Sequence, residues 1–298
     1  MPYPHSRSAA GAWSLLSLMI VAVAAPRASA QNTLRDRLEA LIAQRGAEVA
    51  VAYRTLDRRD ELLINEDAVF HAASTMKVPV MIELFRQDSI GLAKLDQKIP
   101  IVNTFRSIID DSPYTLSPES DSETALYSRV GQPISYRELC WAMITASSNL
   151  ATNILIDRLG PQKIQQTTVE LGASGMQVLR GVEDAKAYEA GRNNTTTAEA
   201  LLVLMQAIAD GKAVSPKASK EMIEILANQQ FRDGIPAGVP EGTRVAHKTG
   251  EISTVNHDAA IVFAPRPYVL VVLVRGLESK AREALIAQIS KTVYEQGQ

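Results

Sequence analysis

The sequence predicts a mixed α/β fold of the α+β type, with an antiparallel sheet built from both ends of the chain and an inserted helical domain. Strand-like patterns lie only near the two ends of the 298 residues, and nearly every segment between them has helical spacing. With 46% hydrophobic residues, the chain can fill the core of one large domain or two interleaved ones. We expect residues 31–72 and 215–298 to form the sheet domain and residues 73–214 the helical domain.

Residues 1–30 are predicted to be a signal peptide. The apolar run 13–25 follows Arg7, and Ala28-Ser29-Ala30 has the small-x-small pattern at which signal peptidase cleaves. The run is shorter than the roughly 20 residues that a spanning helix needs. The single cysteine, Cys140, lies far from the cleavage point and cannot carry a lipid there. We therefore expect a secreted, periplasmic protein without a stable membrane anchor.

The sheet domain is predicted to begin with a helix and a hairpin. Leucine and isoleucine recur at helical spacing over residues 34–42. The segments 48–53 and 61–64 have strand character, and the polar turn 57–60 separates them. These two strands are expected to pair with each other.

Helices are predicted throughout the middle of the chain. Apolar spacing predicts them at residues 75–86, 135–146, 150–159, 161–171, 197–209 and 216–229. Ser135 and Glu138 form a capping-box pattern at the start of the second one. The polar stretch 110–132 is predicted to be a long surface loop with little regular structure.

The end of the chain returns to the sheet. Strand patterns cover residues 243–248, 259–263 and 268–274, and the segment 279–295 has apolar residues on one side of a helix. A cleft is expected where the sheet meets the helical domain.

The first motif with chemical meaning is Ser74-Thr75-Met76-Lys77, the only Ser-x-x-Lys in the chain, placed where a helix begins. Positions i and i+3 share a helix face, so the Lys77 amine can reach the Ser74 hydroxyl. Lys77 can activate Ser74 if burial and cationic neighbours such as Lys248 lower its pKa from about 10.4 to near 7. Taken alone, the pattern is more simply explained by an N-cap serine and a solvated lysine.

The second motif is Ser147-Ser148-Asn149, which interrupts two predicted helices at a polar break. Ser147 is predicted to pass a proton to the leaving atom, and Asn149 to hydrogen-bond a substrate amide. Asn153, one turn later, is predicted to brace a neighbouring loop. A helix end followed by a helix start explains the tripeptide equally well.

The third motif is Lys248-Thr249-Gly250, which is predicted to end a strand. Lys248 and Thr249 suit a substrate carboxylate, and Gly250 lets the backbone approach a ligand closely. The N–H of Glu251 is predicted to pair with that of Ser74 as an oxyanion hole. Three motifs in this order, each at an element boundary, favour an acyl-transferring serine enzyme.

Other chemistries have little support in the sequence. It contains no Gly-x-Ser-x-Gly elbow and no His-x-x-x-His pair, which disfavours Ser-His-Asp hydrolases and zinc hydrolases. We interpret His257-Asp258 as a local structural pair that follows a strand. The formal net charge of −2 argues against a nucleic-acid partner. No metal and no organic cofactor is expected.

With these motifs, the chain resembles the class A β-lactamase family of active-site serine enzymes, which is related to penicillin-binding proteins. The resemblance covers essentially the whole chain after residue 30 and rests on Ser74, Lys77, Ser147, Asn149, Lys248 and Thr249. It implies a secreted hydrolase that opens a β-lactam amide through an acyl-serine intermediate. We expect it to act on a small molecule and as a monomer. The family's second motif usually reads Ser-Asp-Asn, whereas the middle residue here is Ser148.

The resemblance also implies a loop with a Glu-x-x-x-Asn pattern that holds the water for deacylation. Residues 180–197 offer Glu183, whose fourth neighbour is Ala187, and Glu189, which has Asn193 at that spacing. We favour Glu183 as the general base because Glu189 lies close to the next helix; Glu189 or no dedicated base are the alternatives.

The departure from the loop pattern leaves two further hypotheses open. One is a cell-envelope D-alanyl peptidase or esterase with slow deacylation, acting on a D-alanyl peptide. The other is a non-catalytic domain that binds β-lactams, because a fold alone does not fix a function.

Overall fold

The computed structural model describes residues 1–2 and 25–297. The apolar run of the expected signal peptide lies outside these residues except for Ala25, so the signal peptide stays a prediction. Helix α1, Ala25–Ala43, begins at that residue.

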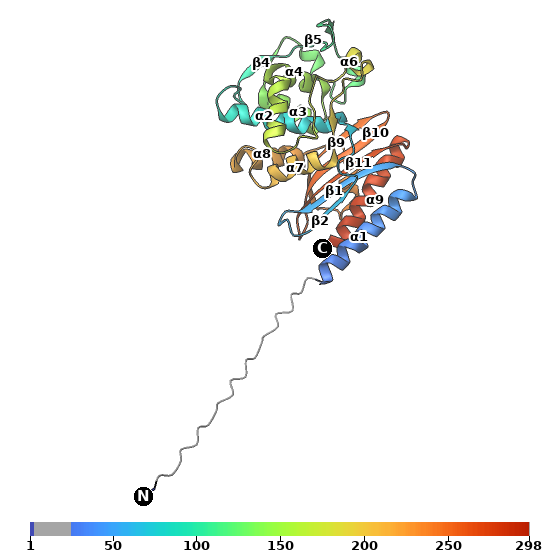
Figure 1. Cartoon of the computed structure of the whole chain (residues 1–298). Helices are drawn as coiled ribbons and strands as arrows, with labels where there is room; N and C mark the ends of the chain where they lie inside the picture. Colours follow the sequence, from blue (N-terminus) through green and yellow to red (C-terminus); the bar gives the residue numbers. More distant parts are fainter. Residues whose placement is uncertain (3–24, 298) are drawn as a thin grey trace.

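A five-stranded antiparallel sheet has the strand order β2-β1-β11-β10-β9 (Figure 1). Its strands are β1 (Glu48–Thr55), β2 (Glu61–Ile64), β9 (Arg244–Ile252), β10 (Val255–Phe263) and β11 (Tyr268–Arg275). The central pairing of β1 with β11 places Val51 opposite Val272 and so joins the two ends of the chain. The predicted fold class, an antiparallel sheet assembled from both termini, is confirmed.

Helices cover both faces of this sheet. On one face α1 and α9 (Ser279–Gly297) run side by side, and Leu38 and Ile289 pack there with Val51 and Val272 (Figure 1). On the other face α7 (Ala198–Ala209) packs against β1, β10 and β11. Because both faces are covered, β11 is buried along nearly its whole length and its sequence is continuously apolar.

The remaining helices gather beyond α7 and are α2 (Lys77–Ser89), α3 (Tyr136–Thr145), α4 (Asn149–Leu159), α5 (Pro161–Glu170), α6 (Ala185–Glu189) and α8 (Pro216–Ala227). Helix α2 packs against α3, α4 and α5 and is buried at Val80, Met81 and Leu84. The long predicted helices are confirmed within a few residues. The capping box is confirmed too, since Glu138 N donates to Ser135 Oγ at 3.2 Å and Ser135 N donates to Glu138 Oε2 at 2.9 Å.

Short elements connect the helices. Two-residue and three-residue strands pair as β3 (Phe70–His71) with β8 (Thr195–Thr196), β4 (Lys98–Pro100) with β7 (Pro133–Ser135), and β5 (Phe105–Arg106) with β6 (Pro113–Tyr114). The 3₁₀ turns are η1 (Ala73–Met76), η2 (Pro118–Ser120), η3 (Tyr127–Arg129) and η4 (Ile235–Gly238). The stretch 110–132 therefore holds only β6, η2 and η3, in agreement with the predicted loop.

Two strand boundaries differ from the prediction. Strand β9 continues to Ile252, so Lys248-Thr249-Gly250 lies within the strand and not at its end. Strand β10 begins at Val255 and not at residue 259. The two strands form a tight hairpin in which Ile252 pairs with Val255, and this pairing keeps both strands regular up to the turn.

The division into two domains stays a prediction. A single buried apolar cluster joins sheet residues such as Ala259 with helix residues such as Met81.

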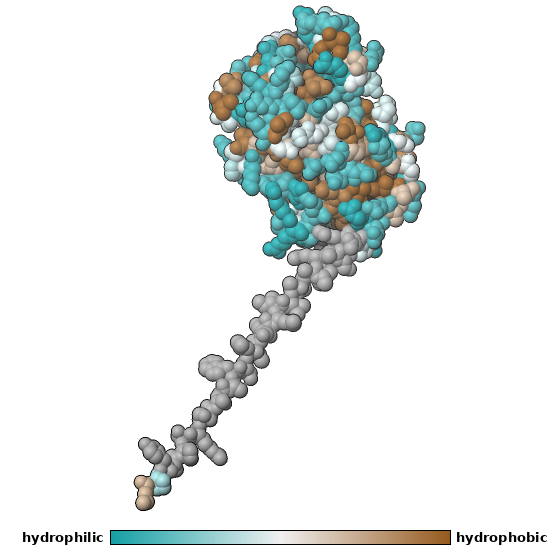
Figure 2. All heavy atoms as spheres, viewed as in Figure 1, coloured by the Kyte–Doolittle hydropathy of each residue, from teal (hydrophilic) through white to brown (hydrophobic). Residues whose placement is uncertain are grey.

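No helix in the described part of the chain is long and apolar enough to cross a bilayer. On the face shown in Figure 2, apolar residues are interspersed with hydrophilic ones.

Candidate active site

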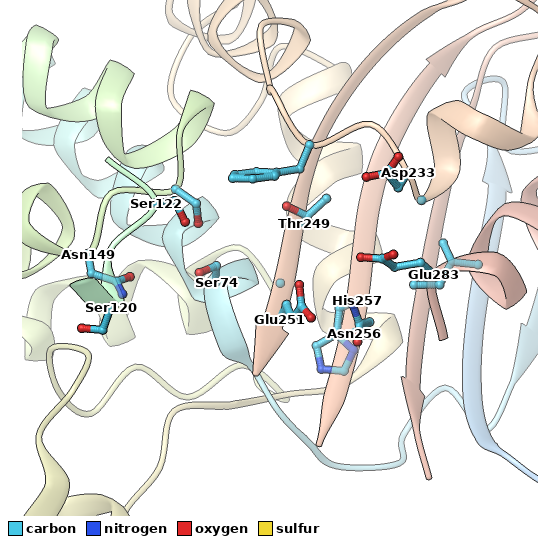
Figure 3. A pocket seen from close by; sticks show the side chains of 15 residues that line it. Ser74, Ser120, Ser122, Asn149, Asp233, Thr249, Glu251, Asn256, His257 and Glu283 are labelled. Carbon is cyan, nitrogen blue, oxygen red and sulfur yellow. The ribbon is translucent and has the colours of Figure 1, made fainter. Parts of the chain in front are cut away.

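The three sequence motifs meet at one cavity of about 240 Å³ between the sheet and the helices. Ser74, Ser147 and Asn149 line it from the helical side, and Thr249 and Gly250 line it from β9. Figure 3 shows Ser74 between Asn149 on one side and Thr249 on the other. The structure therefore brings together segments that are far apart in the sequence.

Ser74 lies in η1, the 3₁₀ turn that leads into α2. The preceding residue, Ala73, has a left-handed φ of 45°, and Thr75 Oγ1 donates to the carbonyl of Ala72 at 2.6 Å. A left-handed alanine is strained, and such strain persists where the surrounding structure enforces it. The turn leaves Ser74 half-buried at the wall of the cavity.

Lys77 begins α2 and is completely buried. Its Nζ donates to the Ser147 carbonyl at 2.6 Å, to Ser147 Oγ at 3.1 Å and to Asn149 Oδ1 at 2.9 Å. No hydrogen bond within the described residues joins Lys77 to Ser74, one turn before it. Burial lowers the pKa of Lys77 to about 7, although the charges of Asp121 and Glu183 act to raise it. A lysine with this pKa is partly neutral at neutral pH and can accept a proton.

Ser147 connects the two lysines of the site. It follows α3 with a left-handed φ of 57°, and its Oγ accepts from Lys248 Nζ at 3.1 Å as well as from Lys77. Lys248 is fully buried in β9 and also donates to the Thr249 carbonyl at 2.9 Å. Burial, together with the positive charge of Lys77, holds the pKa of Lys248 well below its ordinary value.

Gly250 is the point where β9 touches the serine turn. A Cβ built on it would lie 3.0 Å from Thr75 Cγ2 and 3.1 Å from the backbone nitrogen of Ser74. Any side chain here would therefore push the strand away from the turn. The next residue, Glu251, lines the same cavity, and its carboxylate accepts a hydrogen bond from Ser279 Oγ.

Glu183 faces the site from the loop before α6. Its carboxylate accepts from Asn149 Nδ2 at 2.9 Å and from Ser120 Oγ at 3.0 Å, and its φ of 61° is left-handed. Glu183 and Ser74 line a second, adjoining cavity of about 600 Å³. Glu189 also lines this cavity, from the end of α6. Among the described residues, however, only Glu183 of the two is hydrogen-bonded to a motif residue.

Asn153 braces the loop that carries Glu183, as predicted. Val182 N donates to Asn153 Oδ1 at 2.6 Å, and Asn153 Nδ2 donates to the Val182 carbonyl at 3.0 Å. A Cβ on Gly181 would lie 2.6 Å from Asn153 Oδ1, so glycine is required for this close contact. The N–H and the carbonyl of Val182, the residue before Glu183, are therefore both fixed to α4.

Ser120 and Asp121, which the loop 110–132 places at the site, were not predicted from the sequence. Ser120 lines the cavity, and the buried carboxylate of Asp121 accepts from the backbone nitrogens of Asn149 and Leu150. A polar loop without helical or strand periodicity gives no local signal of where it packs. The only available hint was the concentration of Ser and Asp in that loop.

The interpretation of His257 and Asp258 as a local pair is wrong. Both lie within β10, where consecutive side chains point to opposite faces of the sheet. Asp258 instead contacts His247 Nδ1 at 2.9 Å on one face. On the other face His257 lines the cavity, with its Nε2 2.9 Å from the His71 carbonyl, and burial lowers its pKa to about 4.

Known proteins resemble this chain over most of its length. A model of the β-lactamase enzyme family matches residues 33–296. The extended-spectrum β-lactamase PER-1 of Pseudomonas aeruginosa is 24% identical over 94% of this chain and 92% of its own. The β-lactamase AST-1 of Nocardia asteroides is 29% identical over 94% of this chain and 85% of its own.

Among solved structures, PBP-A is 28% identical with a TM-score of 0.76, covering 88% of this chain and 95% of PBP-A. A PBP-A mutant, described as an acyl-enzyme complex with penicillin G, is 26% identical with a TM-score of 0.73 over 90% and 96% of the two chains. Because the family match spans nearly all of the described chain, the protein belongs to the β-lactamase enzyme family.

Proposed function

We propose that the protein is a serine β-lactamase of the class A type, which opens a β-lactam amide through an acyl-Ser74 intermediate and then hydrolyses that ester. The observation that carries this proposal is that Lys77, one turn after Ser74, is buried and has a pKa of about 7. Ser74 itself lines a cavity together with residues of β9. Family membership supports the proposal independently.

Acylation uses the groups that surround Ser74. Neutral Lys77 takes the Ser74 proton, directly or through a water, and Ser74 Oγ attacks the lactam carbonyl carbon. The developing oxyanion accepts hydrogen bonds from the N–H groups of Ser74 and Glu251. As the C–N bond breaks, Ser147 gives its hydroxyl proton to the departing nitrogen and regains one from the adjacent lysines, which lie 3.1 Å from its Oγ.

Substrate binding uses β9 and the α3–α4 junction. Thr249 hydrogen-bonds the substrate carboxylate. The Lys248 amine lies next to Thr249 and donates to its backbone carbonyl. A bound carboxylate favours the charged form of Lys248 and thereby offsets the effect of burial on its pKa. Asn149 Nδ2 is the donor available to a substrate amide, although in this structure it donates to Glu183.

Deacylation is assigned to Glu183. Its carboxylate deprotonates a water that attacks the ester carbonyl, and Ser74 leaves with a proton. The support for this assignment is the cavity that Glu183 shares with Ser74 and its hydrogen bond to Asn149. The small-molecule β-lactam substrate, the monomeric state and export to the periplasm are part of the same proposal.

A second candidate function is that of a D-alanyl peptidase or esterase with slow deacylation. The observation in its favour is that the residue four positions after Glu183 is the buried Ala187, which has no side-chain amide to help hold a water. In such an enzyme β-lactams would acylate Ser74 and remain attached.

Intact mass against time after addition of a penicillin tests these functions together. We expect the wild-type protein to gain the mass of the penicillin and return to its own mass, and to hydrolyse a chromogenic cephalosporin. Ser74→Ala should form no adduct and lose turnover by about 10³-fold or more. The matched control is Ser89→Ala, an exposed serine at the end of α2.

The remaining outcomes are distinct. An adduct that persists for hours supports the slowly deacylating enzyme, and wild-type protein that never gains mass refutes both enzymatic functions. That last result would leave only the hypothesis of a non-catalytic domain.

A further inference from the structure

A buried carboxylate from the loop 110–132 lies beneath the second motif. Asp121 is only 8% exposed. Its Oδ2 accepts from the backbone nitrogens of Asn149 and Leu150, each at 2.9 Å, and from Tyr127 Oη at 2.9 Å. Its Oδ1 accepts from Asn149 N at 3.0 Å and from Glu123 N at 3.1 Å. The carboxylate thus accepts hydrogen bonds from these four donor groups, and two of them, the N–H groups of Asn149 and Leu150, belong to the first turn of α4.

The second motif itself lacks a carboxylate at this point. Its middle residue, Ser148, is the N-cap of α4, and its Oγ accepts from Ala151 N at 3.2 Å. The N–H groups of Asn149 and Leu150 remain to be satisfied, and Asp121 accepts from both although it lies 27 residues before Ser148. A negative charge at the start of a helix is also favourable because of the helix dipole.

We propose that Asp121 is a positioning residue for catalysis, which fixes the first turn of α4 so that Asn149 Oδ1 holds the amine of Lys77, and which supplies the negative charge that this amine faces. The inference rests on the proposed function of Ser74 and Lys77. The sequence predicted the loop 110–132 without assigning it a role. In this protein a loop far from the motif in sequence completes the motif.

Two contacts connect Asp121 to Lys77 through Asn149. Asn149 N is held by Asp121, and Oδ1 of the same asparagine accepts from Lys77 Nζ at 2.9 Å. The charge of Asp121 also raises the pKa of Lys77 against the effect of burial. Two other charged groups lie near Lys77: Glu183, which acts in the same direction, and Lys248, whose own pKa is lowered by the positive charge of Lys77. Tyr127, which donates to Asp121, has a raised pKa and keeps its proton.

A merely structural cap and a positioning carboxylate predict different effects of charge. Asp121→Asn keeps the side-chain shape and one acceptor oxygen but removes the negative charge. The pKa of Lys77 should then fall below its wild-type value of about 7. The acidic limb of the pH profile of acylation should move to lower pH with it. Loss of alignment of Asn149 and Lys77 should slow acylation at the pH optimum by about tenfold or more.

The test measures both quantities in the full protein. The pKa of Lys77 is followed by NMR of protein labelled with ¹³C at lysine Cε, with Lys77→Ala used to assign the signal. Acylation by a penicillin is followed by intact mass across pH. The variants are Asp121→Asn, Asp121→Asn with Ser148→Asp, and the control Glu138→Gln. Glu138 caps the N-terminus of α3, the helix that precedes the second motif. This control therefore removes a capping carboxylate from the end of α3 that lies away from the motif.

We expect Asp121→Asn to lower the pKa of Lys77 and the acylation rate, the added Ser148→Asp to restore both in part, and Glu138→Gln to change neither. Ser148→Asp restores a carboxylate at the N-cap of the same helix, a position that Asp favours. Unchanged pKa and acylation in Asp121→Asn would overturn the inference, as would a slowed variant whose Lys77 pKa stays at the wild-type value. If the wild-type protein is not acylated but the NMR titration shifts as expected, the proposed function fails and the role of Asp121 toward Lys77 stands.

Discussion

Lys77 and Lys248 both donate to the same oxygen, Ser147 Oγ, each at a distance of 3.1 Å. Two buried amines around one hydroxyl cannot both carry a full charge without a large free-energy cost, and the pKa values of both are lowered. The arrangement leaves at least one amine able to accept a proton. It also gives Ser147 a donor on each side when it releases its own proton.

The first prediction concerns the pH dependence of acylation. Because Lys77 must be neutral to act as a base and its pKa is about 7, the acylation rate should rise with pH through about 7 and then level off. Quenched intact-mass measurements with a penicillin between pH 5 and 9 would show this. A rate that is flat over the whole range would contradict the role of Lys77.

The same shift predicts a pH dependence of stability. The folded-state pKa of Lys77, about 7, lies below its unfolded value of about 10.4, so the unfolded state binds more protons between these values. The contribution of Lys77 to the free energy of unfolding should therefore increase as the pH rises from about 7 toward 10. Urea unfolding of the wild type and of Lys77→Met, compared across this range, isolates the effect. The free energy of unfolding of the wild type minus that of Lys77→Met should increase with pH. A value independent of pH would argue against a buried, neutralised amine.

The third prediction concerns the contact between β9 and the serine turn. Gly250→Ala should lower the free energy of unfolding by about 1–3 kcal/mol, because the new methyl group has no room against Ser74 and Thr75. Acylation should fall along with stability, since the strand that carries Thr249 must move outward. Unfolding curves and acylation rates measure the two effects.

The control for this substitution is Gly46→Ala. Gly46 has a φ of +65°, a Cβ added to it would meet no atom within 4 Å, and it lies between α1 and β1. Alanine there should cost about 1–2 kcal/mol of backbone strain. It should leave acylation unchanged. Equal loss of acylation in both variants would show that Gly250 acts only through overall stability.

The fourth prediction concerns the brace between α4 and the loop of Glu183. Asn153→Ala removes both hydrogen bonds to Val182 and should destabilise the fold by about 1–3 kcal/mol. Deacylation should slow more than acylation, because the loop carries Glu183 and not Ser74. Time courses of the acyl-enzyme by intact mass separate the two rates.

Gln165→Ala provides the matched comparison. Gln165 holds the earlier part of the same loop through Val178 N at 2.8 Å and the Met176 carbonyl at 3.0 Å, and neither of these residues lines the two cavities at Ser74. This variant should lose similar stability with the acyl-enzyme lifetime unchanged. A longer lifetime in Gln165→Ala than in Asn153→Ala would contradict the specific role of Asn153.

The fifth prediction separates the two glutamates of the loop. Glu183→Gln should slow deacylation by about 10²-fold or more, so that the acyl-enzyme accumulates, because a general base contributes a factor of this size. Glu189→Gln, in the same cavity but without a bond to Asn149, should deacylate at the wild-type rate. The opposite pattern would move the role to Glu189, and no effect in either variant would mean that neither glutamate is the base.

Local sequence patterns determined the elements and the motifs of this protein. Apolar spacing predicts α4 and α7 to within two residues because helical periodicity is a property of neighbouring positions. The order of the three motifs likewise indicates acyl-serine chemistry before any contact is known. The end of β9 was predicted incorrectly because a hairpin partner, and not the strand's own residues, decides how far pairing extends.

Only the tertiary structure decided how the site is completed. Asp121 reaches Asn149 from a loop without periodicity, and Glu183 reaches the same asparagine across 34 residues of chain. The lowered pKa of Lys77 has the same origin, since it depends on complete burial by segments that follow it at a distance in the sequence. Burial and hydrogen-bond partners are set by how remote segments pack, and no short stretch of sequence encodes that packing.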